Sequence, residues 1–200
     1  MLGWISDDNT DNEVRENSFK PLAKQFFKEL IASSSWVKCD KIILYFIFMK
    51  EKLYTQPDMC MHKFTILSIG VTSHLNAHGG VFRRIKNKTL LEAALAWEDE
   101  DTYKNYVIGK FDVKWADVDF IYTAMNISEH WIVLAMDINR GHIFVFDSLP
   151  SYTPMTKLVN WLEPLTVTVP SLLHYCDVDR SKSDLSTVRW KTSRPMNVDI

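Results

Sequence analysis

Two apolar runs separated by a four-residue turn decide the fold of this 200-residue chain. Trp131 to Asp137 reads WIVLAMD, His142 to Asp147 reads HIFVFD, and residues 138–141 between them read INRG. Asn and Gly in so short a connection are typical of a β-hairpin, because both tolerate the positive φ angles of tight turns. We therefore expect two antiparallel strands joined by Asn139 and Arg140.

The chain before and after the hairpin supplies further elements. Residues 118–123 alternate as a strand would. Thr153 and Pro154 suit the start of a helix, with Thr as the cap and Pro at the first helical position, while Pro164 and Pro170 are expected to break the chain beyond that helix. Its apolar face comprises Met155, Leu158, Val159 and Leu162.

Two more helices are expected near the N-terminus. Apolar residues recur every four positions from Ser18 to Ile31, with Ser18 as the candidate cap and Pro21 in the first turn. A second helix, apolar on nearly all sides and therefore expected to be buried, covers Asp40 to Leu53. Residues 1–17 lack apolar periodicity and are interpreted as a mobile leader.

Helices followed by a compact hairpin block and another helix predict an α+β domain over residues 18–200. We expect a central, mostly antiparallel sheet flanked by helices rather than regular α/β alternation. A capping box at residues 89–92 predicts one more helix, through Leu95 or Trp97. From Asp177 onward the chain is polar, and no closing element is expected.

The region before that capping box contains a candidate metal-binding pair. His74 and His78 have the i, i+4 spacing of two ligands on one helix, but no Glu lies between them as a zinc hydrolase would need. Gly79 and Gly80 indicate a turn and, with Asn76, argue against a helix there. We therefore expect no bound metal.

Composition excludes several other classes of protein. The 23 basic and 25 acidic residues give a net charge of −2, without the basic excess that nucleic-acid binding needs. The longest apolar run, residues 42–49, is too short to span a membrane. Three scattered cysteines and a polar N-terminus without a signal peptide indicate a reducing compartment. We expect an intracellular protein, in the nucleus or the cytoplasm, with neither nucleic acid nor membrane as a partner.

One pair of residues in the hairpin has the properties of a catalytic base and its partner. If Asn139 and Arg140 form a two-residue turn, Asp147 lies opposite Ile132, and His130 is its diagonal neighbour on the same face, roughly 7–8 Å away by backbone. A carboxylate so placed fixes the tautomer of an imidazole that takes a proton from a nucleophile. A one-residue slip would separate the pair. From the pattern alone, a core histidine and a turn aspartate remain the alternatives.

Three stretches of this region resemble a known family. Residues 118–122 (VDFIY), 129–134 (EHWIVL) and 143–149 (IFVFDSL) resemble the core of the Ulp-type, or SUMO-protease, cysteine peptidases, and more closely the variants found in plant transposon-encoded proteins. Trp36-Val37 resembles the Trp-Leu segment near the start of that domain. The resemblance extends over about Trp36 to Asp199.

The resemblance implies roles for three residues. His130 would be the general base, Asp147 its orienting carboxylate, and Trp131 a wall of the channel that admits the diglycine tail of the substrate. A plain core tryptophan is the alternative for Trp131. No cofactor is implied.

The cysteines depart from the family pattern. There the nucleophile lies in a segment like Gln-x-x-x-x-x-Cys-Gly, after a strand that residues 190–199 resemble. Cys176, the one cysteine after Asp147, precedes that stretch and has neither a Gly after it nor a Gln before it. We therefore interpret Cys176 as a structural thiol and expect residues 18–200 to be an incomplete catalytic domain.

The expected function is thiol-dependent hydrolysis of the peptide or isopeptide bond after the C-terminal glycine of a SUMO-type ubiquitin-like protein, in conjugates or precursors. The 200-residue chain itself is expected to be inactive because the nucleophile segment is missing. The alternative is a protease-like domain that only binds a ubiquitin-like protein, or a transposon relic.

Overall fold

The computed structural model describes residues 2–16, 21–32, 37–84, 101–178 and 189–195. The chain divides into two compact units, Met1–Thr55 and Gln56–Ile200. The candidate residues of the hairpin belong to the second unit.

The first unit contains short elements where the sequence suggested none. Its elements are α1 (Leu2–Ser6), η1 (Asp8–Thr10), β1 (Val14–Arg15), β2 (Leu22–Ala23), α2 (Lys24–Ile31) and α3 (Cys39–Thr55). The expected helix from Ser18 starts later, at Lys24, because Leu22 and Ala23 pair with β1 as an antiparallel ladder. Pro21 therefore precedes the helix, and Ser18 lies outside the described residues. The mobility of residues 1–17 stays a prediction.

Helix α3 confirms the second expected helix of this unit, although not its expected burial. Lys41 and Leu44 are buried, whereas Tyr45 and Phe48 are exposed. Lys41 is held by an ion pair with Glu29 of α2, 2.8 Å long. The apolar segment therefore forms a partly exposed helix rather than one buried on nearly all sides.

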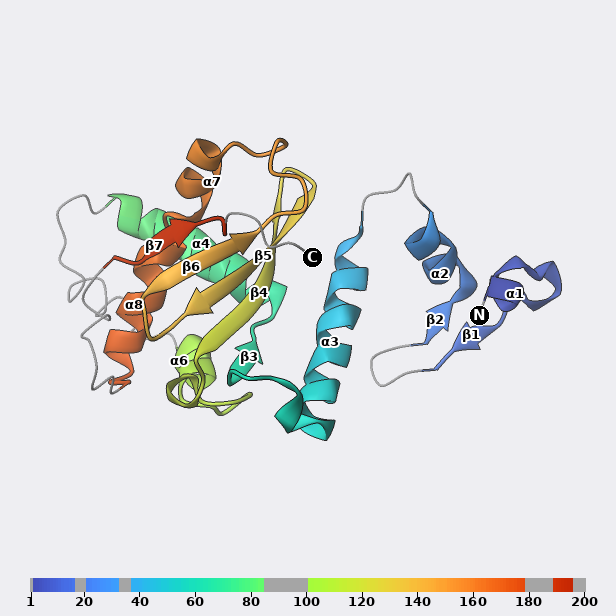
Figure 1. The fold of residues 1–200 in the computed structure, drawn as a ribbon, viewed down its shortest axis with the longest axis horizontal. Helices are drawn as coiled ribbons and strands as arrows, with labels where there is room; N and C mark the ends of the chain where they lie inside the picture. The colour runs from blue at the N-terminus through green and yellow to red at the C-terminus, as the bar shows by residue number, and fades with distance from the viewer. Residues whose placement is uncertain (1, 17–20, 33–36, 85–100, 179–188, 196–200) are drawn as a thin grey trace. The chain divides into compact units, whose positions relative to one another are not determined.

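Within the described residues of the second unit, five strands form one sheet (Figure 1). Its two central pairings, β4 with β5 and β5 with β6, are antiparallel, and both edge strands pair in parallel. The strands, in spatial order, are β3 (Phe64–Ile66), β4 (Phe120–Ile127), β5 (His130–Asp137), β6 (His142–Phe146) and β7 (Lys191–Ser193). Helices accompany the sheet, so the predicted α+β class is confirmed; they are α4 (Ile69–Arg84), α6 (Asp101–Val107), α7 (Met155–Leu162) and α8 (Leu165–Tyr175), with 3₁₀ turns η2 (Pro57–Met59) and η3 (Trp115–Asp117).

The predicted hairpin has the predicted register. Asp137 pairs with His142 and Val133 with Phe146, so one further step places Ile132 opposite Asp147. Gly141 has a φ of 61°, and Asp137 Oδ1 accepts a hydrogen bond from the backbone N–H of Arg140 at 2.9 Å. Asn139 and Arg140 do not have positive φ, and the strand pairing ends at Asp137 and His142. The register is therefore as predicted, but within this turn only Gly141 takes the left-handed conformation.

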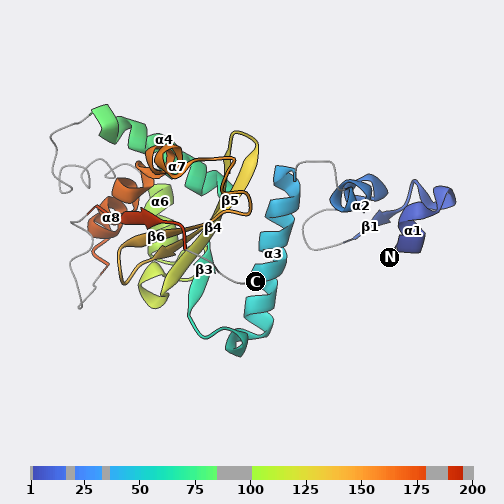
Figure 2. The same ribbon diagram turned by 45° about the horizontal axis from the view of Figure 1, so that its top comes forward.

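Helices α4 and α8 lie side by side and supply much of the helical part of the core (Figures 1 and 2). Alternate residues of β5 and β6 contribute the strand side of that core. The principal members are Leu75, Ile132, Leu134, Met136, Ile143, Val145, Leu158, Leu162, Leu165, Val169 and Leu172. His130 therefore stands at the end of the row of β5 residues that faces this core.

Three expectations about the helices were not met or lie outside the structure. Gly79 and Gly80 mark no turn, since α4 runs through them to Arg84, so His74 and His78 do lie on one helix. Pro154 is the cap residue of α7 rather than its first helical residue, because the helix begins at Met155. The capping box at residues 89–92 lies outside the described residues.

Pro170 does not interrupt the secondary structure, as the sequence suggested, but lies inside helix α8. A proline removes the N–H that would bond the carbonyl four residues earlier, here that of Thr166. That carbonyl instead accepts a hydrogen bond from the backbone N–H of Trp190 at 3.0 Å. The lost helical bond is thus replaced, and the replacement fixes the entry to β7.

Candidate active site

The turn that leads into β5 positions His130. Ile127 pairs with His130 across a two-residue turn of Ser128 and Glu129, whose φ angles are 53° and 70°. Positive φ at both positions is the pattern of a type I′ hairpin turn, which is strained for residues with side chains. Asn126 Oδ1 supports it by accepting from the Glu129 N–H at 3.0 Å. His130 follows directly and is buried.

Asp147 lies one residue past β6, where the hairpin register predicts it. His130 Nε2 donates to Asp147 Oδ1 at 2.7 Å, and the two side chains are 4% and 1% exposed. Oδ1 also accepts from the backbone N–H of Leu149 at 2.9 Å. The predicted contact between the side chains of His130 and Asp147 is therefore confirmed.

A third charged group completes the arrangement. Arg194, just beyond β7, donates from Nη2 to Asp147 Oδ2 at 2.5 Å. Burial by itself would raise the pKa of Asp147, but the hydrogen bonds from His130 and Leu149 and the charge of Arg194 outweigh it. The net effect holds the pKa of Asp147 below its ordinary value, so the carboxylate is ionised at neutral pH.

The sequence of the chain matches the model of one protein family over most of its length. Residues 35–198 match the model of the Ulp1 protease family, C-terminal catalytic domain. This chain belongs to the Ulp1 protease family. The members of that family are cysteine peptidases, and membership supports a SUMO-type protease function for this domain.

Solved structures show the same fold as this Ulp1-family chain. The catalytic domain of the Ulp1-like SUMO protease of Chaetomium thermophilum is 16% identical, with a TM-score of 0.55, over 96% of this chain and 69% of that one. A C-terminal Ulp1 protease domain, solved in complex with Smt3, the yeast ortholog of SUMO, is 17% identical, with a TM-score of 0.53, over 96% of this chain and 68% of that one. No curated protein sequence matches the chain significantly.

Two residues that contact the pair were missed by sequence reasoning. Arg194 reaches Asp147 only because β7 runs parallel to β6, a pairing between segments about fifty residues apart that no local pattern announces. Tyr152 lies with its ring centroid 5.3 Å from that of His130 and donates from its hydroxyl to the carbonyl of Ser128 at 2.8 Å. The polar, proline-containing sequence around both residues is typical of ordinary loops.

Trp131 follows His130 in β5 and therefore faces the opposite side of the sheet. It is half-buried and pairs with Asn126 of β4. Its role as a wall of the substrate channel stays a prediction.

The three cysteines lie in described residues, and all of them are free thiols. Cys176 is the C-cap of α8 and packs against the core. Burial raises its pKa to about 11, against a smaller opposing effect of Lys104. A nucleophilic cysteine needs the reverse, a lowered pKa that favours the thiolate. Cys39 is exposed and Cys60 half-buried.

Among the described residues no group of three or more His, Cys, Asp or Glu side chains could hold a metal ion. In the same part of the chain, no helix is both long and apolar enough to cross a membrane.

Proposed function

We propose that His130 and Asp147 are the general base and orienting carboxylate of a cysteine peptidase that cleaves after the C-terminal glycine of a SUMO-type ubiquitin-like protein. The observation that carries this proposal is the buried 2.7 Å contact between them in a chain of the Ulp1 family. An ordinary core histidine does not need a buried, ionised carboxylate at one ring nitrogen. A general base does.

The geometry defines how the pair would act. Asp147 accepts from Nε2, which holds the proton on that nitrogen and directs Nδ1 to take the proton of a thiol. When the imidazolium forms, the carboxylate stabilises its positive charge. The thiolate then attacks the carbonyl carbon of the scissile bond, the imidazolium gives its proton to the leaving amine as the C–N bond breaks, and water hydrolyses the resulting thioester to release the C-terminal carboxylate and the thiol. No cofactor is required for this sequence of steps.

The nucleophile that this scheme needs is proposed to lie beyond Ile200. The raised pKa of Cys176 supports this, because that thiol is protonated at neutral pH. The 200-residue polypeptide would then carry base and carboxylate without a nucleophile, and it would be inactive. Trp131 is proposed as a wall of the channel that receives the glycine tail.

The substrate class is proposed from the relatives. The C-terminal Ulp1 protease domain was solved with Smt3 bound, which supports a SUMO-type protein as substrate. Conjugates and precursors of such a protein are the proposed targets, and the nucleus or the cytoplasm is the proposed location.

A reporter released from the C-terminus of SUMO tests the proposal. The 200-residue polypeptide should release none, whereas a polypeptide extended through the next cysteine should be active and should lose activity with His130→Ala. Cys176→Ser should be nearly silent in the longer polypeptide. Release by the 200-residue chain that disappears with Cys176→Ser would make Cys176 the nucleophile. Inactivity of the longer chain on every ubiquitin-like substrate would overturn the protease proposal.

The alternative is a protease-like domain that binds a ubiquitin-like protein without cleaving it, and the raised pKa of Cys176 is compatible with it because that thiol would not act as a nucleophile. Calorimetric titration with SUMO separates the cases. If the 200-residue chain binds SUMO and the longer chain stays inactive, the domain is a binding module. If the chain neither binds SUMO nor becomes active when it is extended, the result supports a relic.

A further inference from the structure

Arg194 joins three segments around the carboxylate of Asp147. Its Nη2 donates to Asp147 Oδ2 and to the carbonyl of Thr153, and its Nη1 donates to the carbonyl of Pro150 at 3.4 Å. The side chain is 18% exposed. One guanidinium therefore bonds both the carboxylate and two carbonyl groups of the segment that follows it.

The position of Arg194 is determined by hydrogen bonds that are independent of Asp147. The N–H of Trp190 bonds Thr166 of α8 at 3.0 Å, and the N–H of Lys191 bonds Gly141 of the hairpin turn at 3.1 Å. The parallel pairing of β7 with β6 then aligns Phe144 with Ser193, so Arg194 leaves the sheet beside the end of β6. Asp147 leaves β6 at that same end.

The carboxylate needs such a partner. The side chain of Asp147 is 1% exposed, and a carboxylate shielded from water in this way needs pairing and hydrogen bonds to stay ionised. His130 is neutral for part of the proposed cycle, so it cannot supply a permanent positive charge. Arg194 can, because a guanidinium stays protonated throughout the range in which proteins are folded.

The turn after Asp147 is held as well. Residues 148–153 carry Tyr152, which contacts the His130 ring and bonds Ser128 in the strained turn before it. Anchoring Pro150 and Thr153 to Arg194 therefore restrains Tyr152 and, through it, the imidazole of His130. Leu149, whose N–H bonds Asp147, lies in the same turn.

We propose that Arg194 is a positioning residue for the His130–Asp147 pair: its guanidinium keeps Asp147 ionised and holds residues 148–153 against the imidazole. The effect of Arg194 on enzymatic activity rests on the function proposed above. Its effect on the ionisation of Asp147 rests on the contacts alone. Arg194 touches no reacting atom.

Substitutions at two arginines separate its charge from its geometry. Arg194→Met removes the charge and keeps a long unbranched side chain, whereas Arg194→Lys keeps the charge but lacks the planar fork with which Arg194 reaches Asp147, Thr153 and Pro150 from two nitrogens. Arg189→Met is the matched control, because Arg189 also pairs with a carboxylate, that of Glu163 at 2.8 Å, on the exposed surface.

The structural test uses the 200-residue polypeptide, with the side-chain carboxyl carbon of Asp147 followed by NMR during an acid titration. In Arg194→Met the pKa of Asp147 should rise; in Arg194→Lys it should rise less, and in Arg189→Met it should not move. An unchanged titration of Asp147 in Arg194→Met would overturn the proposal. If Arg194→Met fails to fold, hydrogen exchange of the Leu149 N–H in Arg194→Lys decides: exchange faster than in wild type would support the anchoring role, and exchange as slow as in wild type would contradict it.

The catalytic test uses the longer polypeptide. Arg194→Met should lower kcat/KM by roughly tenfold to a hundredfold, the loss that removing an outer-shell partner of a metal ligand typically causes, and should shift the acid limb of the pH profile to higher pH. Arg194→Lys should recover the pH profile more fully than the rate. A rate loss with an unmoved profile would contradict the electrostatic role. If the longer chain is inactive altogether, the proposed function fails. The titration of Asp147 in the 200-residue chain still tests whether Arg194 keeps that carboxylate ionised.

Discussion

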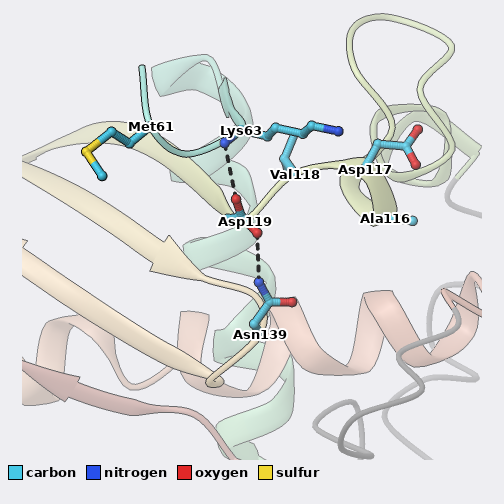
Figure 3. Close-up of a pocket in the computed structure, with 7 residues that line it drawn as sticks. All are labelled: Met61, Lys63, Ala116, Asp117, Val118, Asp119 and Asn139. Atoms are coloured by element: carbon cyan, nitrogen blue, oxygen red, sulfur yellow. Dashed lines mark hydrogen bonds between the residues drawn. The ribbon is translucent and has the colours of Figure 1, made fainter. Parts of the chain in front are cut away.

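Two aspartates stand at opposite ends of the same sheet, and they differ in exposure and in the groups that bond them. Asp119 precedes β4, where it accepts from the N–H of Lys63 at 3.1 Å and from Asn139 Nδ2 at 3.0 Å (Figure 3). Its side chain is 41% exposed, at the edge of an open hollow of about 530 Å³. Asp147 follows β6, is 1% exposed, and is bonded by His130 and Arg194.

The difference is one of solvent and charge rather than of residue type. Neutral amides hydrogen-bond Asp119 and tie the start of β4 to the hairpin turn, while the exposed His62 lies 3.9 Å from its Oδ2, so water can reach all of these contacts. Two ionisable groups, His130 and Arg194, bond Asp147, whose side chain is shielded from water. Because the effective dielectric constant is lower there, the electrostatic interaction between the carboxylate and these groups is stronger. The first arrangement stabilises a loop, and the second can control a proton.

The largest expected effect is on catalysis. In the longer polypeptide, Asp147→Asn should lower kcat by roughly four orders of magnitude, as loss of the orienting carboxylate does in serine proteases, because the tautomer of His130 is no longer held. The hydrolysis rate of a SUMO reporter measures it. Asp119→Asn is the matched control and should stay within about twofold of wild type. Equal losses in the two variants would remove the distinction between the two ends of the sheet.

A smaller but still large effect is expected on stability. Asp147→Ala leaves Arg194 and His130 without their common partner in a buried site, which typically costs about 3–5 kcal/mol. Asp119→Ala removes hydrogen bonds at an exposed site and should cost about 1 kcal/mol. Urea unfolding of the two variants at neutral pH compares them, and a ranking opposite to this would contradict the burial argument.

The pH dependence of stability sharpens the same comparison. Because the folded pKa of Asp147 lies below its unfolded value, its carboxylate contributes stability that is complete above the unfolded pKa, near 4. That contribution is lost as the pH falls through the folded pKa. The difference in unfolding free energy between wild type and Asp147→Asn should therefore shrink on acidification from pH 6 to pH 3. A difference that stays constant over this range would show that Asp147 is not ionised in the folded protein.

The smallest expected effect concerns Cys176. With a pKa of about 11, its thiol should react with iodoacetamide at pH 7 more slowly than the exposed thiol of Cys39. Mass spectrometry of digested, partly alkylated protein measures the two rates. Faster reaction of Cys176 would reveal an activated thiol and reopen its candidacy as nucleophile.

The hairpin and the His130–Asp147 contact were predictable because strand alternation and turn chemistry are local signals. Once Asn139 and Arg140 were identified as the turn, the register placed Asp147 beside His130 without further information. The resemblance to Ulp-type peptidases added the family. The register and the contact needed only residues within a span of about twenty positions.

What was missed depends on contacts between distant segments. Pro170 stays helical because the N–H of Trp190 bonds the carbonyl that it leaves open. Arg194 joins the site because β7 adds to the edge of the sheet, in parallel with a strand about fifty residues earlier. Neither partnership has a sequence pattern of its own, so a proline was interpreted as a break and an arginine as part of a polar tail.

The tautomer of His130 tests the central claim most directly. Nitrogen-15 NMR of the neutral imidazole in the 200-residue polypeptide should show the proton on Nε2 and none on Nδ1, because Asp147 Oδ1 accepts from Nε2. Asp147→Asn should weaken that preference, whereas Asp119→Asn should leave it unchanged. A proton found on Nδ1, or a tautomer indifferent to Asp147→Asn, would contradict the assignment of His130 and Asp147 as base and orienting carboxylate.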